Sequence, residues 1–132
     1  MSLLNGKSVM VTGATGSFGK RLIRLLLDQY DPKSVIAFSR DELKQYQLQQ
    51  LIPSPKLRFF LGDVRDKERL YRATDGVDVV IHAAAMKQVS ASELNPMEAI
   101  KTNIIGAENV VNACIDQGVH KVIALSTDKA AN

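Results

Sequence analysis

The stretch VMVTGATGSFG, residues 9–19, decides the fold of this chain. An apolar, β-branched run leads into glycines at positions 13, 16 and 19, and residues 17–29 follow with Phe18, Leu22, Leu25 and Leu26 at helical spacing. Glycines between a strand and a helix allow a tight turn and a close approach of pyrophosphate to free N–H groups at the helix N-terminus. The spacing is G-x-x-G-x-x-G rather than G-x-G-x-x-G, and a plain turn requiring positive φ is the alternative. The position between the first strand and the first helix favours the phosphate-binding interpretation.

Apolar runs and helical patterns alternate along the rest of the chain, which is typical of βαβ units and a parallel sheet. We expect strands at residues 9–11, 35–38, 57–61, 78–82 and 121–126, and helices at about 17–29, 41–51, 66–75 and 96–117. Right-handed crossovers then predict an α/β, doubly wound parallel sheet of the Rossmann type with strand order 3-2-1-4-5. Ligands of such sheets bind beyond the carboxyl ends of the strands, where the following residues fall: Gly13, Arg40, Asp63, Ala83 and Ser126.

The composition is that of one globular domain. The chain has 132 residues, 45% of them hydrophobic and 23% charged, and its mean hydropathy of -0.05 excludes a disordered or fibrous polymer. The net charge of +3 comes without a block of like charges, which favours a phosphate-bearing ligand over nucleic acid. No apolar run is long enough for a membrane span or a secretory leader, so we expect no membrane partner.

Cysteine and histidine usage argues against a metal site. The single cysteine, Cys114, is expected to be a small buried hydrophobe in the reducing cytoplasm. His82, at the end of the fourth predicted strand, is expected to be packed and hydrogen-bonded rather than catalytic, and His120 to lie at the surface. Two histidines so placed, with one cysteine, do not indicate a transition-metal centre.

The residues after the second strand bear on the choice of cofactor. An NAD-selective domain usually offers an acid here to the ribose diol, whereas this chain offers Ser39 and Arg40. Arg40, with Lys44 one helical turn further, could hold a 2′-phosphate, which favours NADP over NAD. The alternatives are that both cations belong to a solvated helix end capped by Asp41, or that Asp41 itself binds the ribose.

Two further segments carry polar groups at the same sheet edge. After the third strand, Asp63 could accept from an adenine amino group while Val64 packs on the ring, although an ordinary turn aspartate is an equal alternative. After the fifth strand, Thr127, Asp128 and Lys129 place a hydroxyl, a carboxylate and an amine side by side. Such a set could orient a substrate and supply a general acid and a general base, and a simple polar loop is the alternative.

Taken together, TGATGSFG, FSRDELKQ, GDVRD, HAAAMKQV, KTNIIGAENV and ALSTDKAAN resemble the extended short-chain dehydrogenase/reductase superfamily. Within it they are similar to the inverting UDP-N-acetylglucosamine 4,6-dehydratases, which begin pseudaminic acid synthesis in bacteria, and the resemblance covers essentially the whole chain. The resemblance implies a lyase reaction with an internal redox step, in which the cofactor is regenerated in each turnover. Hydride passes from sugar C4 to NADP, water is eliminated across C5 and C6, and the hydride returns to C6 with inversion at C5.

The resemblance also implies roles for individual residues. Thr127 would polarise the region of the 4-hydroxyl, Asp128 would act as the acid on the leaving 6-hydroxyl, and Lys129 as the base at C5. Lys87 would lie near both cofactor and substrate, and Asn103 matches a position that helps to order the active site. The implied cofactor-binding set is Gly13, Thr15, Gly16, Ser17, Phe18, Gly19, Ser39, Arg40, Asp41, Glu42, Leu43, Lys44, Asp63, Val64, Ala83, Lys87 and Asn103.

The chain departs from the superfamily pattern in one respect. A Tyr-x-x-x-Lys motif is expected, but the three tyrosines, Tyr30, Tyr46 and Tyr71, are followed four residues on by Ser34, Gln50 and Asp75. We therefore expect residues 1–132 to be the NADP-binding part of a longer cytoplasmic, homo-oligomeric enzyme, truncated after the fifth strand, without its sugar-binding region and inactive alone. A UDP-N-acetylglucosamine epimerase, a capsule-type dehydratase/epimerase and a non-catalytic NADP-binding module remain alternatives.

Overall fold

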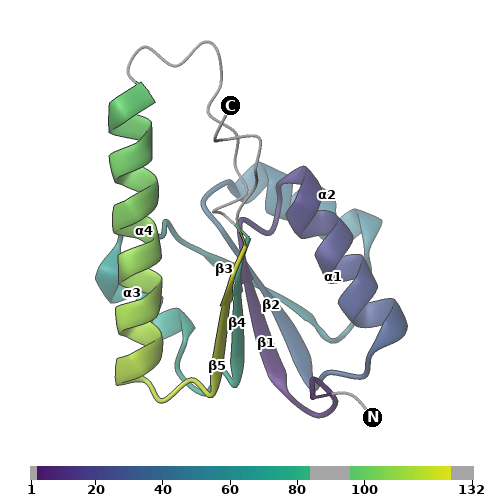
Figure 1. Cartoon of the computed structure of the whole chain (residues 1–132). Helices are drawn as coiled ribbons and strands as arrows, with labels where there is room; N and C mark the ends of the chain where they lie inside the picture. Colours follow the sequence, from purple (N-terminus) through teal and green to yellow (C-terminus); the bar gives the residue numbers. More distant parts are fainter. Residues whose placement is uncertain (1–2, 84–95, 126–132) are drawn as a thin grey trace.

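The computed structural model describes residues 3–83 and 96–125. Within these residues the strands form one parallel sheet in the order β3-β2-β1-β4-β5 (Figure 1). The strands are β1 (Ser8–Thr12), β2 (Ser34–Ser39), β3 (Leu57–Leu61), β4 (Val79–His82) and β5 (Lys121–Ala124), and the helices are α1 (Ser17–Gln29), α2 (Glu42–Leu51), α3 (Lys67–Ala73) and α4 (Pro96–Asp116). The predicted fold class and strand order are confirmed.

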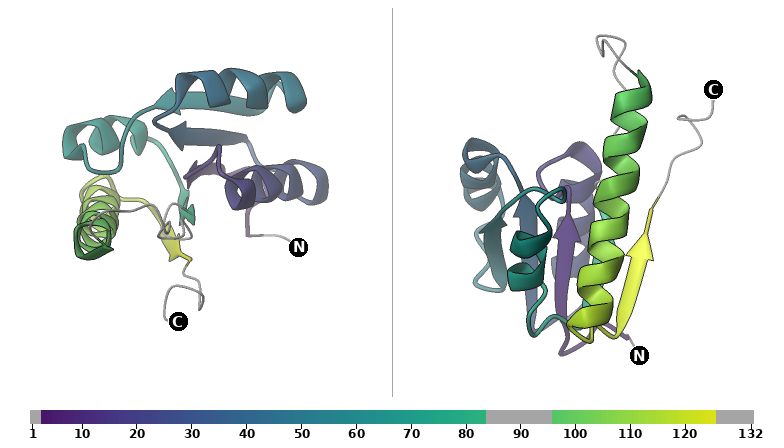
Figure 2. Two further views of the ribbon diagram at one scale, coloured as in Figure 1. Left: turned by 90° about the horizontal axis from the view of Figure 1, so that it is seen from above. Right: turned by 90° about the vertical axis from the view of Figure 1, so that its left-hand side faces the viewer.

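Helices cover both faces of the sheet. Helices α1 and α2 lie on one face and α3 and α4 on the other, as the views in Figure 2 show. The central strand β1 alternates between two cores, because Val9 and Val11 pack with Ile23 of α1 while Met10 packs with Val110 of α4. All of these side chains are fully buried, which explains why the strand is a continuous apolar run.

Capping residues mark the helix boundaries. The Asp41 carboxylate accepts from the Lys44 backbone N–H at 3.0 Å and starts α2, and Asp66 accepts from the Arg69 N–H at 3.2 Å and starts α3. Gly118, with φ of 70°, follows the end of α4.

The packed face of α1 coincides only in part with the apolar residues that lie at helical spacing. Phe18 and Leu25 are 38% and 48% exposed, and the face of α1 that packs on the sheet carries Gly19, Ile23 and Leu26. Gly19 lets the helix approach the backbone of the preceding turn, at Gly13 and Ala14, closely. Cys114, by contrast, is buried as expected, and burial raises the pKa of its thiol to about 11.

The carboxyl ends of the strands meet at one edge of the sheet. The chain leaving each strand stays attached to the neighbouring strand there: the Ala14 N–H donates to Phe38 O, the Gly62 N–H to Ser39 O and the Leu125 N–H to His82 O. The loops after β1, β2 and β3 are therefore held side by side. No helix among the residues described is both long and apolar enough to cross a membrane.

Candidate functional site

The glycine turn after β1 is built from three glycines with different roles. Gly13 has φ of +64°, in the left-handed region that favours glycine. A Cβ on Gly19 would lie 2.2 Å from the Gly13 carbonyl oxygen and 2.8 Å from two backbone atoms of Ala14, so the packing of helix against turn requires glycine there. Gly16 is different, because its φ of -73° suits any residue and a Cβ would meet only the Gly13 oxygen at an ordinary 3.5 Å. The fold does not require glycine at position 16.

No side chain caps the N-terminus of α1. Gly16 occupies the N-cap position and offers no side-chain hydrogen bond, and no acidic residue lies in the first turn. The first N–H groups of a helix have no partner within the helix, and together with the helix dipole they favour an anion. A phosphate group would meet these donors directly, with no side chain at position 16 in the way.

A hollow of about 370 Å³ lies between the start of α1 and α2. It brings Thr15, Gly16 and Ser17 of the turn together with Lys44, as the sequence analysis expected for residues of one site. Lys20, one turn into α1, also lines it and was not anticipated. The full lining is Thr15, Gly16, Ser17, Lys20, Lys44, Gln47, Leu48 and Leu51.

The end of β2 is fixed by a buried amide. Gln45 of α2 donates from Nε2 to the Ser39 hydroxyl at 2.9 Å and to the Ser39 and Phe60 carbonyl oxygens at 3.2 Å each. This contact ties α2 to the ends of β2 and β3. Gln45 was missed from the sequence, although the SRDELKQ motif contains it.

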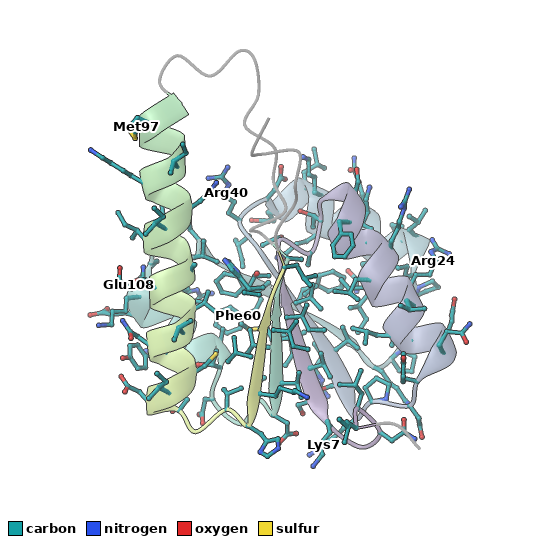
Figure 3. All side chains as sticks on the ribbon, in the orientation of Figure 1. Lys7, Arg24, Arg40, Phe60, Met97 and Glu108 are labelled. Atoms are coloured by element: carbon teal, nitrogen blue, oxygen red, sulfur yellow. The ribbon has the colours of Figure 1, made fainter. Side chains whose placement is uncertain are left out.

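Asp63 lies between two arginines after β3. Both of its carboxylate oxygens accept from Arg65, the shortest contact being 2.7 Å from Nη2, and Arg40 Nη1 lies 3.7 Å from Oδ2. The hydrogen bonds from Arg65 lower the pKa of Asp63 to about 2. Figure 3 shows Arg40 at the carboxyl edge of the sheet, beyond Phe60. Arg65, which the sequence analysis did not identify, therefore holds the side chain of Asp63, the residue that is predicted to bind adenine.

The loop after β3 is anchored to α4. The side-chain amide of Asn109 donates to the carbonyl oxygens of Val64 and Arg65 at 3.1 and 3.2 Å. A Cβ on Gly106 would lie 2.7 Å from a methyl group of Val64, so the helix and the loop pack closely at that glycine. These two helical positions keep Val64 and Asp63 at the sheet edge.

His82 is a structural residue, as predicted. Its Nδ1 lies 2.7 Å from the Thr12 hydroxyl, its ring is 3% exposed, and burial lowers its pKa. His120 is exposed, also as predicted. Ala83, directly after β4, is buried in the core of the α1 and α2 face. Within residues 3–83 and 96–125, no group of three or more His, Cys, Asp or Glu side chains could hold a metal ion.

The structure does not place the remaining predicted residues in the hollow or at the Asp63 cluster. Glu42 and Leu43 lie in the exposed first turn of α2, outside the hollow, and Asn103 is exposed on α4. Asp41 serves as the helix cap. Four predicted positions fall outside the residues described: Lys87, Thr127, Asp128 and Lys129.

The Asp63 cluster predicts a pH dependence of stability. Because folding lowers the pKa of Asp63 from 3.8 to about 2, its contribution is complete above about pH 5 and is lost as pH falls toward 2. Asp63→Asn is expected to lower the urea midpoint of unfolding at pH 6, and the difference from wild type should shrink as the pH falls. Urea unfolding of both proteins at pH 6 and at pH 3 measures this difference. A deficit equally large at both pH values would contradict the assigned ion pair.

Comparisons with known proteins place this geometry in a family. A model of the polysaccharide biosynthesis protein family matches residues 9–132. The chain is 58% identical to the inverting UDP-N-acetylglucosamine 4,6-dehydratase of Campylobacter jejuni over 98% of its own length and 39% of that protein. It is 50% identical to the UDP-glucose 4-epimerase of Rickettsia akari over 94% of its length and 37% of that protein.

Solved structures share the fold. The structure called Pen, from Bacillus thuringiensis, superposes with a TM-score of 0.84 at 41% identity, covering 93% of this chain and 38% of that one. The dTDP-glucose 4,6-dehydratase DesIV of Streptomyces venezuelae, with NAD bound, superposes with a TM-score of 0.75 at 30% identity, covering 87% and 38%. The chain thus spans about two fifths of the length of the relatives it matches. On the match over residues 9–132, this chain belongs to the polysaccharide biosynthesis protein family.

Proposed function

We propose that these residues form the dinucleotide-binding part of a nucleotide-sugar enzyme. The observation that carries the proposal is Gly16, which the fold does not require and which leaves the bare N-terminus of α1 open to a phosphate group. NAD bound to the related DesIV structure supports a nicotinamide dinucleotide as the ligand. Thr15 and Ser17 would contact the pyrophosphate beside Gly16, and Asp63 and Val64 would hold the adenine.

We further propose that the dinucleotide is NADP. Ser39, Arg40 and Lys44 provide donors near the end of β2, and Lys20 adds a second cation to the hollow. The nearest acid, Asp41, has one carboxylate oxygen engaged by the Lys44 N–H as the cap of α2. A cationic, donor-rich site suits a 2′-phosphate better than a ribose diol.

For the full-length protein, we propose the inverting 4,6-dehydration of UDP-N-acetylglucosamine. Support comes from the 58% identical Campylobacter dehydratase and from the STDKAAN motif after β5. When bound, NADP supplies a hydride acceptor and donor. Asp128 would protonate the leaving 6-hydroxyl, Lys129 would remove the proton at C5, and Thr127 and Lys87 would position the sugar.

The test is to incubate the full-length protein with UDP-N-acetylglucosamine and to follow the sugar nucleotide by mass spectrometry and NMR. We expect loss of one water and a 4-keto, 6-deoxy product with inverted C5. The Rickettsia epimerase supports a second candidate, for which the product would be an isomer of unchanged mass. An unchanged substrate would support a non-catalytic NADP-binding module and contradict both activities.

We also propose a cytoplasmic homo-oligomer with no nucleic-acid or membrane partner. The free, buried Cys114 suits a reducing compartment. Helix α4 supports an oligomer, because it extends past the carboxyl edge of the sheet (Figures 1 and 2). It also carries large exposed apolar side chains. These are Met97, Ile100, Ile104, Ile105, Val111 and Ile115.

A further inference from the structure

The buried amide of Gln45 carries an inference about the Ser39 hydroxyl. Gln45 is 8% exposed, and its Nε2 lies within 3.2 Å of three oxygens, two of them carbonyls. Carbonyl oxygens only accept hydrogen bonds, so the nitrogen rather than the oxygen of the amide must face them. The orientation of the Gln45 amide is thereby determined.

The same contact fixes the direction of the Ser39 hydroxyl bond. The amide nitrogen has no acceptor capacity, so at 2.9 Å the Ser39 oxygen must be the acceptor from Gln45. The hydroxyl proton then points elsewhere. Ser39 is 8% exposed and ends β2 directly before Arg40, so its hydroxyl lies at the carboxyl end of the strand with its proton not used on Gln45.

Two carboxylates of this region, Asp41 and Asp63, already accept hydrogen bonds from the protein. Asp41 takes the Lys44 N–H, and both oxygens of Asp63 take Arg65 donors while Arg40 lies beside them. A phosphate, which at neutral pH mainly accepts hydrogen bonds, matches the donors of the Ser39 hydroxyl, the Arg40 guanidinium and the Lys44 ammonium.

We propose that Gln45 is a positioning residue that holds the Ser39 hydroxyl as a donor and so selects a 2′-phosphate over a free ribose diol. The inference rests on the proposed binding of NADP and adds the residue that makes the site discriminate. Gln45 itself does not touch the cofactor. It acts through Ser39, and this predicts that the two residues are coupled.

The experiment measures binding of two probes that differ by one phosphate, adenosine 2′,5′-bisphosphate and 5′-AMP, by calorimetry on the full-length protein. Gln45→Met keeps the length of the side chain and removes the donor. We expect about five- to tenfold weaker binding of the bisphosphate and less than twofold change for 5′-AMP. Ser39→Ala should give the same pattern, and adding Gln45→Met to Ser39→Ala should cost nothing more.

The controls separate this inference from the function it rests on. Gln49→Met makes the same change on an exposed position of α2, one turn further on, and should leave both affinities unchanged. If wild type binds the two probes equally, the NADP proposal fails. If wild type prefers the bisphosphate but Gln45→Met weakens both probes equally, or the two losses simply add, the positioning role is overturned. If Gln45→Met does not fold, the Ser39→Ala variant is sufficient as a test: an unchanged preference for the bisphosphate over 5′-AMP would overturn the positioning role.

Discussion

Gly19→Ala is expected to lower the free energy of unfolding by about 3 kcal/mol, whereas Gly16→Ala changes it by less than about 1 kcal/mol. The new methyl at position 19 would overlap the Gly13 carbonyl oxygen at 2.2 Å and two backbone atoms of Ala14 at 2.8 Å. No side chain can rotate away from this overlap. The turn is also held, since the Ala14 N–H donates to Phe38 O, so either the turn or α1 must shift.

Gly16→Ala is the matched control, for which we expect little change in stability but a loss of dinucleotide affinity. A methyl there meets one oxygen at 3.5 Å with φ of -73°, so the fold accommodates it. It would nevertheless stand over the N-terminal N–H groups of α1, and we expect dinucleotide affinity to fall at least about tenfold, or about 1.4 kcal/mol. Urea unfolding and calorimetric titration of both variants measure the two effects. Full binding by Gly16→Ala would remove the main support for a phosphate at this turn.

The fold could be predicted from the sequence because its signals are local. The apolar runs, the caps at Asp41 and Asp66 and the glycine turn each act within a few residues, and the handedness of the crossovers then leaves few strand orders. Leu25 lies at helical spacing but is 48% exposed, because apolar spacing alone does not reveal which face of α1 touches the sheet. The packed face includes Gly19, whose close approach to the backbone of the turn is seen only in the folded chain.

The site could be predicted only in part. Residues that follow strands were identified, because parallel strands bring their carboxyl ends to one edge, and Lys44 does line a hollow with the glycine turn. Gln45 and Arg65 were missed because their importance comes from contacts across elements: one joins α2 to two strands, and the other holds Asp63. A polar side chain at a buried position of α2, beside Leu48, was the available signal for Gln45.

In the full-length protein with the proposed dehydratase activity, Lys129→Ala is expected to reduce turnover of UDP-N-acetylglucosamine by about 10²- to 10⁴-fold, the usual contribution of a general base. The chain is attached to the sheet edge just before this residue, because the Leu125 N–H donates to His82 O at the end of β4. Lys129 itself lies outside the described residues. Without its amine, the proposed proton removal at C5 has no assigned base, although the cofactor site is untouched.

Lys121→Ala provides the matched control for Lys129→Ala. Lys121 is exposed and begins β5, so it lies at the opposite edge of the sheet, far from the carboxyl ends, and its loss should leave turnover within about twofold of wild type. Both variants should bind NADP as tightly as wild type, because neither residue belongs to the turn or to the Ser39 and Arg40 segment. If only Lys129→Ala loses turnover, and it still binds NADP, then Lys129 acts as a base rather than as a structural lysine. Retained turnover would assign the C5 proton to another residue, and loss in both variants would point to lost positive charge rather than to position.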